Sequence, residues 1–180
     1  MRVIAGTARG QPLVVPRDRG TRPITDRVKE TLFAILGERV PDARVLDLYA
    51  GSGAIGIEAL SRGATSATFV EQARPALAVL RTNLERTRMA DRATVQPLDV
   101  GRFLAGTDDG PWDLVFLDPP YEVRDIVAPL RAVAPHLAPD AMVVIKHFWR
   151  TDLPAVDGLD PVRQRRFGET MLSFLEARGR

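Results

Sequence analysis

The tetrapeptide Asp118-Pro119-Pro120-Tyr121 places a carboxylate, two prolines and an aromatic ring directly after an apolar run at 114–117. The apolar run indicates a buried strand that ends at a polar edge. Because the prolines fix φ and donate no backbone N–H, the Asp118 carboxylate and its neighbouring carbonyls form a rigid cluster of acceptors. The amino edge of a base could stack on Tyr121 while this cluster receives its N–H groups. The motif therefore indicates methylation of an exocyclic amine, with residues 118–121 as the catalytic group.

Acidic residues end four of the strands that the sequence predicts. From residue 45 onward, strand-like and helix-like segments alternate, which is typical of a parallel sheet with helices on both faces. In such sheets ligands bind at the edge where the carboxyl ends of the strands meet. The strands predicted near 45–49, 67–70, 94–98 and 114–117 bring four acids to this edge, namely Asp47, Glu71, Asp99 and Asp118.

The segment 51–56, Gly-Ser-Gly-Ala-Ile-Gly, satisfies G-x-G-x-x-G between a predicted strand and helix, and Glu71 follows 20 residues after Gly51. This pattern is the dinucleotide fingerprint, but it also suits a loop whose glycines let the backbone approach S-adenosylmethionine. Asp47 favours the second cofactor, because its carboxylate suits an ammonium group and would repel a pyrophosphate. Glu71 fits the ribose hydroxyls of either cofactor. Asp99 could accept a hydrogen bond from adenine, and both acids could instead cap helices.

Most of the net charge lies in the first 30 residues. These hold seven basic against three acidic groups, a balance of +4, so the remaining 150 residues come to −2 in a chain of net charge +2. A basic arm on a near-neutral body suits a phosphate backbone, and a solvated arginine-rich hairpin is the alternative. The candidate RNA-binding residues are Arg2, Arg9, Arg17, Arg19, Arg22 and Arg27.

The composition bounds the class of protein. The 180 residues suit one domain with a substantial core, and the absence of cysteine excludes disulfides and thiolate sites. His136 and His147 are eleven residues apart without ligand spacing, so we expect no metal. No apolar run approaches the roughly 20 residues that span a membrane, and no secretory signal is evident at the N-terminus. A cytoplasmic protein without membrane partners is expected.

Other segments complete the expected fold. Residues 1–20 read as a basic β-hairpin or loose arm that contacts RNA, and residues 21–180 as the catalytic domain. Thr25 is the expected N-cap of a helix that ends near Gly37, and Pro75 opens another helix. Further helices are predicted at 54–62 and 125–137, a fifth strand at 142–145, and a closing antiparallel hairpin at 162–167 and 171–175.

These motifs resemble those of class I S-adenosylmethionine-dependent methyltransferases that act on amino groups. The run at 22–30, Arg-Pro-Ile-Thr-Asp-Arg-Val-Lys-Glu, is further similar to the bacterial 16S ribosomal RNA guanine-N2 methyltransferase family, as are segments 4–10 and 167–170. The resemblance spans almost the whole chain. It implies an α/β Rossmann-like sheet that is mostly parallel with a C-terminal antiparallel hairpin. It also implies S-adenosylmethionine as cofactor, bound by Asp47, Tyr49, Gly51, Ser52, Gly53, Glu71, Asp99 and Asp118.

The resemblance implies methyl transfer to the exocyclic N2 amine of a guanine in 16S ribosomal RNA, within the small subunit and by an enzyme compatible with a monomer. An adenine-N6 methyltransferase is the alternative in the same class. Two other classes are an NAD-dependent oxidoreductase, which leaves residues 118–121 unexplained, and a noncatalytic RNA-binding module, which the four acids disfavour. Phe148, Trp149 and Arg150 are expected to pack under the final hairpin rather than stack on RNA.

Overall fold

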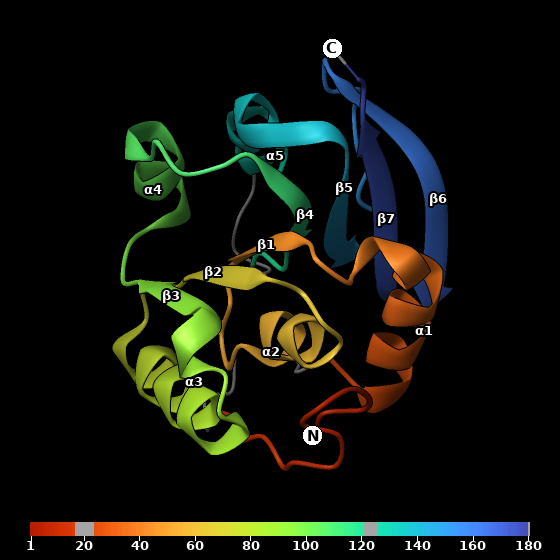
Figure 1. The fold of residues 1–180 in the computed structure, drawn as a ribbon. Coiled ribbons are helices and arrows are strands. Elements are labelled where there is room, and N and C mark those ends of the chain that lie inside the picture. Colours follow the sequence, from red (N-terminus) through yellow and green to blue (C-terminus); the bar gives the residue numbers. More distant parts are fainter. Residues whose placement is uncertain (17–23, 121–125, 180) are drawn as a thin grey trace.

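A seven-stranded sheet with the order β3-β2-β1-β4-β5-β7-β6 runs through the structure (Figure 1). The structure is a computed structural model and describes residues 1–16, 24–120 and 126–179. Its first five strands are parallel: β1 (Arg44–Leu48), β2 (Ser66–Val70), β3 (Ala93–Gln96), β4 (Trp112–Leu117) and β5 (Leu137–Phe148). The antiparallel strands β6 (Leu159–Phe167) and β7 (Thr170–Ala177) close the sheet beside β5. The predicted Rossmann-like sheet with an antiparallel hairpin is confirmed.

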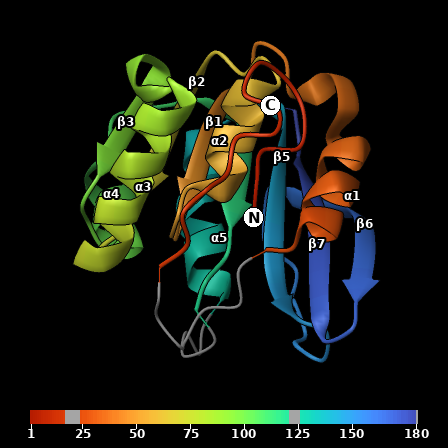
Figure 2. The same cartoon turned by 90° about the horizontal axis from the view of Figure 1, so that it is seen from below.

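Helices cover both faces of the sheet. Helices α1 (Asp26–Leu36), α2 (Ala54–Ser61) and α3 (Arg74–Thr87) lie on one face, and α4 (Val100–Gly106) and α5 (Val127–Val133) on the other (Figures 1 and 2). Strand β1 is buried from Val45 to Leu48, as a central strand between two layers requires. The two cores meet across it, one containing Phe33, Phe69 and Phe116, the other containing Trp112 and Leu130.

Three local signals in the sequence place helix ends correctly. The Thr25 hydroxyl accepts a hydrogen bond from the backbone N–H of Val28 at 3.3 Å, so Thr25 is the N-cap of α1. Gly37 ends α1 at φ +51° and opens a short 3-10 helix, Gly37–Arg39. Pro75 occupies the first turn of α3, where a missing N–H costs nothing.

The region between residues 126 and 148 differs from the prediction. The helix predicted at 125–137 ends as an α-helix at Val133 and continues as a 3-10 turn, Ala134–His136, because Pro135 cannot supply the next helical hydrogen bond. Leu137 therefore begins β5 instead of ending the helix. The predicted strand at 142–145 is the centre of a twelve-residue strand whose register with β4 shifts between Trp112 and Leu114.

The N-terminal segment packs against helices α2 and α3 and is not a separate layer (Figure 2). Within residues 1–16, part of the segment predicted as a hairpin or loose arm, one antiparallel bridge joins Arg2 to Pro12. Val3, Ala8 and Leu13 are buried in the core with α2 and α3. The division of the chain at residue 20 falls in the range 17–23, outside the described residues, and stays a prediction.

Within the described ranges, no helix is long and apolar enough to cross a membrane. Among the same residues, no group of three or more histidine, aspartate and glutamate side chains could hold a metal ion.

Candidate active site

The carboxyl ends of strands β1, β2 and β4 meet at one edge of the sheet. Leu48 pairs with Val70 of β2 on one side and with Leu117 of β4 on the other. The residues that follow, including Glu71 and Asp118, therefore leave the sheet at the same edge on either side of β1, and the Asp118 backbone N–H donates to the Leu48 carbonyl oxygen at 3.4 Å. This edge is where parallel α/β sheets bind ligands.

Glu71 holds the glycine loop that follows β1. Its Oε2 accepts a hydrogen bond from the Gly51 backbone N–H at 2.9 Å, and its Oε1 accepts one from Ala73 N–H at 2.7 Å. Gly51 has φ +55°, and a Cβ placed there would meet only the Tyr49 carbonyl oxygen, at 4.0 Å. The loop backbone is therefore open to a ligand at Gly51, with a carboxylate beside it.

The other two loop glycines serve packing. A Cβ at Gly53 would lie 2.3 Å from Leu80 Cδ1, and one at Gly56 would lie 2.3 Å from Phe69 Cε1. Gly53 also has φ +76°, which disfavours any other residue. These glycines let α2 begin directly against the sheet and α3, so its N-terminus faces the site edge.

Asp47 lies beneath the loop and is 2% exposed. Its Oδ2 accepts a hydrogen bond from the Gly56 backbone N–H at 3.0 Å. Burial raises the pKa of Asp47 to about 8, with smaller contributions from the negative charges of Asp118 and Glu71. In the structure this carboxyl orders the start of α2, and its predicted contact with a cofactor ammonium group stays a prediction.

Asp99 and Tyr49 stand near each other at the same edge. Asp99 is the N-cap of α4 and accepts a hydrogen bond from Arg102 N–H at 3.1 Å, which matches the capping alternative raised from the sequence. Asp99 is exposed, and its second oxygen has no part in this cap. Burial raises the pKa of the half-buried Tyr49, and the negative charge of Asp99 adds to this effect. The adenosine contact of these two residues stays a prediction.

A lysine that sequence reasoning missed pairs with Asp118. Lys146 on β5 donates to both carboxylate oxygens of Asp118, each at 2.7 Å. Burial raises the pKa of Asp118, and the charge and hydrogen bonds of Lys146 act in the opposite direction. The Asp118 side chain remains 29% exposed, so it can still meet a ligand. Pro119 and Pro120 follow it half-buried at the edge, and Tyr121 lies outside the described residues.

Asn83 links the glycine loop to the N-terminal segment and was also missed. Its Nδ2 donates to the Ser52 carbonyl oxygen and to the Val14 carbonyl oxygen, both at 2.9 Å, and its Oδ1 accepts from Val14 N–H at 2.8 Å. Ser52 is thereby fixed through its backbone. Asn83 is fully buried, so these bonds satisfy its amide without water.

The predicted RNA-binding arginines do not form one described cluster. Arg2 pairs with Asp26 at 3.5 Å and Arg27 is exposed nearby, both at the N-terminal end of α1. Arg9 is exposed beside Ala8, whose N–H donates to Ser61 at the far end of α2 from the glycine loop. Arg17, Arg19 and Arg22 lie outside the described residues.

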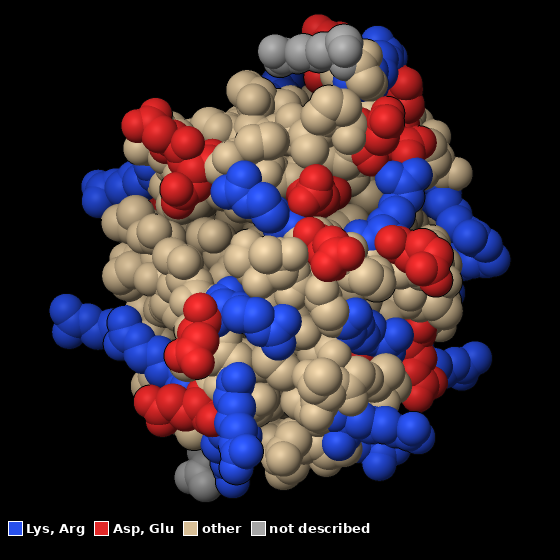
Figure 3. Space-filling model, in the orientation of Figure 1, with Lys and Arg blue, Asp and Glu red and all other residues tan. Residues whose placement is uncertain are grey.

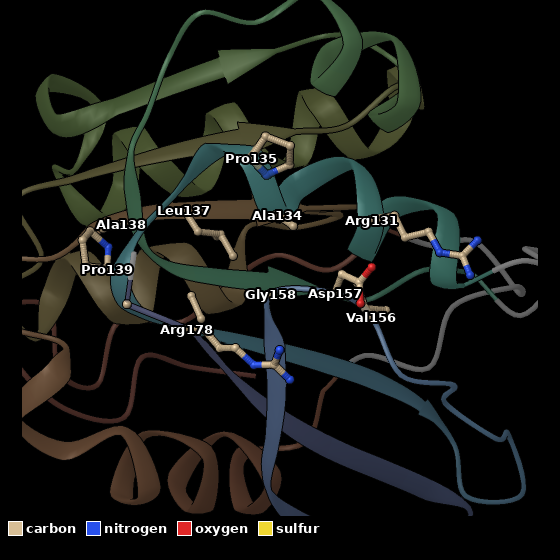
Figure 4. Close-up of a pocket in the computed structure, with 12 residues that line it drawn as sticks. Arg131, Ala134, Pro135, Leu137, Ala138, Pro139, Val156, Asp157, Gly158 and Arg178 are labelled. Carbon is tan, nitrogen blue, oxygen red and sulfur yellow. The ribbon is translucent and has the colours of Figure 1, made fainter.

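A cavity of about 510 Å³ lies at the opposite edge of the sheet (Figure 4). Its lining includes Leu137 and Pro139 at the start of β5, Arg131 of α5 and Arg178 beyond β7. Since β5 is parallel to β4, the start of β5 and the end of β4 are at opposite edges. This cavity is therefore separate from the candidate site.

The sheet order, the glycine loop at Gly51 and the acceptor cluster at Asp118 define a class I methyltransferase, the S-adenosylmethionine-dependent class with a Rossmann-like fold. The chain belongs to the family described as "Conserved hypothetical protein 95", whose model matches residues 1–176.

Relatives with assigned names point the same way. Ribosomal RNA small subunit methyltransferase D of Escherichia coli is 40% identical over 160 residues, covering 87% of this chain and 79% of the relative. YlbH of Bacillus subtilis, provisionally named an rRNA methyltransferase, is 35% identical, covering 99% of this chain and 100% of the relative. The solved structure of E. coli YhhF, provisionally named a methyltransferase, superposes with a TM-score of 0.89 at 34% identity, covering 100% and 99% of the chains. The predicted resemblance to bacterial ribosomal RNA methyltransferases is confirmed.

Proposed function

We propose that this protein transfers a methyl group from S-adenosylmethionine to the exocyclic N2 amine of a guanine in 16S ribosomal RNA of the small subunit. The observation that carries the proposal is the position of the Asp118 carboxylate, held by Lys146 at 2.7 Å, at the sheet edge it shares with Glu71 and the glycine loop. We infer that an acceptor for an amine and a seat for a nucleoside cofactor lie together at this edge.

The residues present fit S-adenosylmethionine, which supplies an electrophilic methyl group on a sulfonium. The open backbone at Gly51 admits a ligand, as its unhindered Cβ direction indicates. Glu71 retains acceptor capacity for ribose hydroxyls beside its two backbone bonds, since an ionised carboxylate has about four lone-pair sites. Asp99 and Tyr49 are proposed to contact the adenine end. Asp47 supports the loop through Gly56 and is proposed to accept a hydrogen bond from the ammonium end.

Asp118 orients the amine and stabilises the charge that develops on it. The lone pair of an aromatic amine is drawn into the ring, so the amine is a weak nucleophile. N–H bonds to the Asp118 carboxylate and the Pro119 carbonyl hold the nitrogen in place and localise its electrons. As the nitrogen becomes positive, the carboxylate stabilises it, a contribution that grows toward the transition state. The proton passes to Asp118 late, after the N–C bond has formed.

The donor pattern of the base favours guanine at this carboxylate. Guanine presents N1–H and N2–H side by side, so both oxygens of Asp118 can each accept one hydrogen bond. Adenine presents its N6 amine beside the N1 lone pair, which would face the carboxylate without a donor. Lys146 takes part of each oxygen's acceptor capacity and leaves room for one further bond apiece.

An RNA substrate is supported by the exposed arginines at the N-terminal end of α1, Arg2 and Arg27, and by the name of the E. coli relative. Arg9, Arg17, Arg19 and Arg22 are proposed as further phosphate contacts. Tyr121 is proposed to stack on the target base once it has left its helix or loop.

Radiolabelled methyl transfer followed by nucleoside analysis tests the proposal. The substrates are small ribosomal subunits and total RNA from a strain that lacks the enzyme, with DNA in parallel. We expect label in N2-methylguanosine of 16S RNA. Label in N6-methyladenine would overturn the guanine assignment, and no label in any nucleic acid would overturn the proposed activity.

A further inference from the structure

The outermost strand of the sheet, β6, is basic near its end. Every residue from Asp160 to Arg166 is exposed, and three of the last four are arginines, Arg163, Arg165 and Arg166. Lys and Arg side chains stand along the edge where Figure 1 places β6 (Figure 3). The acidic residue at the start of this run, Asp160, is already paired with Arg178 at 2.7 Å.

Trp149, just beyond β5, contacts two guanidinium groups, that of Arg166 on β6 and that of Arg150. The Arg166 Cζ lies 3.7 Å and the Arg150 Cζ 4.7 Å from the centre of the Trp149 ring. Arg166 Nε also donates to the Gly168 carbonyl oxygen at 2.8 Å, and the Trp149 backbone N–H donates to the Glu169 carbonyl oxygen at 2.9 Å. As expected, Trp149 packs on the hairpin. It also holds the two arginine side chains in place, so less conformational entropy is lost when they bind a ligand.

This group of residues lies at the edge that carries the candidate site. Lys146 pairs with Leu172 and Phe148 with Thr170, so the turn between β6 and β7 lies beside the end of β5. Trp149 is three residues beyond Lys146, which contacts Asp118. We call the group Trp149, Arg150, Arg163, Arg165 and Arg166 the hairpin patch.

We propose that the hairpin patch is a second RNA-binding surface, which binds backbone phosphates of the RNA that flanks the target nucleotide. It lies on the side of Asp118 away from β1, across the sheet order β1-β4-β5-β7-β6. Arg163 and Arg165 are opposite Phe174 and Leu172 and so share one face, whereas Arg166 is opposite Met171 on the other. Guanidinium groups on both faces of an exposed edge can bind the phosphates of an RNA strand that passes around this edge. This inference rests on the proposed function, because it assumes an RNA substrate.

Charge on an outer strand has a competing explanation, the prevention of sheet-to-sheet aggregation. If the arginines serve that role, their removal should cause self-association and leave the affinity for RNA unchanged. The two explanations therefore predict different outcomes for the same variant.

The test compares two matched double variants. Arg163→Gln/Arg165→Gln removes two charges from the patch. Arg81→Gln/Arg86→Gln removes two exposed charges from α3, which flanks the other end of the sheet. Binding to small ribosomal subunits from a strain lacking the enzyme is measured with S-adenosylhomocysteine present, from about 50 to 300 mM salt. We expect the patch variant to bind about tenfold more weakly at physiological salt, with a salt slope smaller by roughly 1.4 to 1.8. The α3 variant should match the wild type.

Trp149→Leu keeps all charges and tests the positioning role of the ring. We expect a higher KM for the subunit, an unchanged kcat and an unchanged Kd for S-adenosylhomocysteine. The inference is overturned if the patch variant binds subunits with wild-type affinity and salt slope, or if it only self-associates in sedimentation. Failure of the proposed function is distinguishable, because the wild-type protein would then place no label in N2-methylguanosine of 16S RNA.

Discussion

Lys146 Nζ lies 2.7 Å from both carboxylate oxygens of Asp118, so the ammonium group bridges the end of β5 and the end of β4. The two residues are 28 apart in the chain and meet because β4 and β5 are parallel neighbours. Burial raises the pKa of Asp118, and the charge and hydrogen bonds of Lys146 oppose that rise.

Removal of the Lys146 charge should move the acidic limb of the pH–rate profile. Without the ammonium group, burial raises the pKa of Asp118 further, so Lys146→Met should begin to lose activity at a higher pH than the wild type. Lys146→Arg keeps the charge and should stay near the wild-type limb. The measurement is kcat/KM for methyl transfer from pH 5.5 to 9. If the acidic limbs of the Lys146→Met and wild-type profiles coincide, the role of Lys146 is refuted.

Asp47 should make the folded state less stable as pH rises. In the unfolded chain it ionises near pH 3.8, whereas in the folded state its pKa is about 8. Between these values the folded state binds more protons, so the free energy of unfolding falls as pH increases from about 4 to 8. Asp47→Asn should flatten this decline, by an amount on the order of a few kcal/mol across the range. Urea unfolding at several pH values measures it, and parallel curves for the two proteins would contradict the assignment.

Glu58 should be critical for folding because it is fully buried with several donors. It accepts hydrogen bonds from Ile4 and Ala5 N–H and pairs with Lys29 at 3.1 Å and Arg62 at 2.8 Å. Glu58→Gln leaves the buried Lys29 without its counter-charge, and we expect a loss of about 3–5 kcal/mol in the free energy of unfolding.

Adding Lys29→Met to Glu58→Gln should recover part of that loss, because the uncompensated charge is gone. Exposed Glu38 provides the control, and Glu38→Gln should change stability by less than about 0.5 kcal/mol. Chemical unfolding gives all four values. Equal stabilities for Glu58→Gln and Glu38→Gln would show that the network is dispensable.

Glu71 should matter for cofactor binding more than for stability. Glu71→Ala frees the Gly51 and Ala73 N–H groups and removes the proposed ribose acceptor. We expect the Kd for S-adenosylhomocysteine to rise roughly ten- to a hundredfold, since charged hydrogen bonds contribute about 1.5–3 kcal/mol. Glu85→Ala on the exposed face of α3 is the matched control. Calorimetric titration that finds equal Kd values for both variants would remove Glu71 from the cofactor site.

Short-range signals predicted much of the fold. The N-cap at Thr25, the proline in the first turn of α3 and the apolar runs that end at Glu71 and Asp118 depend on neighbours in the chain, so the sequence contains them. The prediction that the helix reaches Leu137 was wrong. The apolar residues keep a helical spacing past Pro135, but the backbone cannot remain helical there.

The contacts missed by the sequence are long-range ones. Lys146 reads as an ordinary strand residue until β4 is placed beside β5, and Asn83 as a helix residue until residue 14 is placed against it. Asp47 shows the same limit, because its position before the glycines was predictable, whereas its burial and its bond to Gly56 depend on how α2 packs.

The most direct test of the central claim is methyl transfer by Asp118→Asn, which preserves the shape of the side chain and removes its charge. With saturating S-adenosylmethionine and small subunits, we expect kcat to fall by about a hundredfold or more, while the unfolding midpoint stays near wild type. Asp118→Ala should be at least as impaired. An Asp118→Asn enzyme that turns over within a few fold of the wild-type rate would contradict the account.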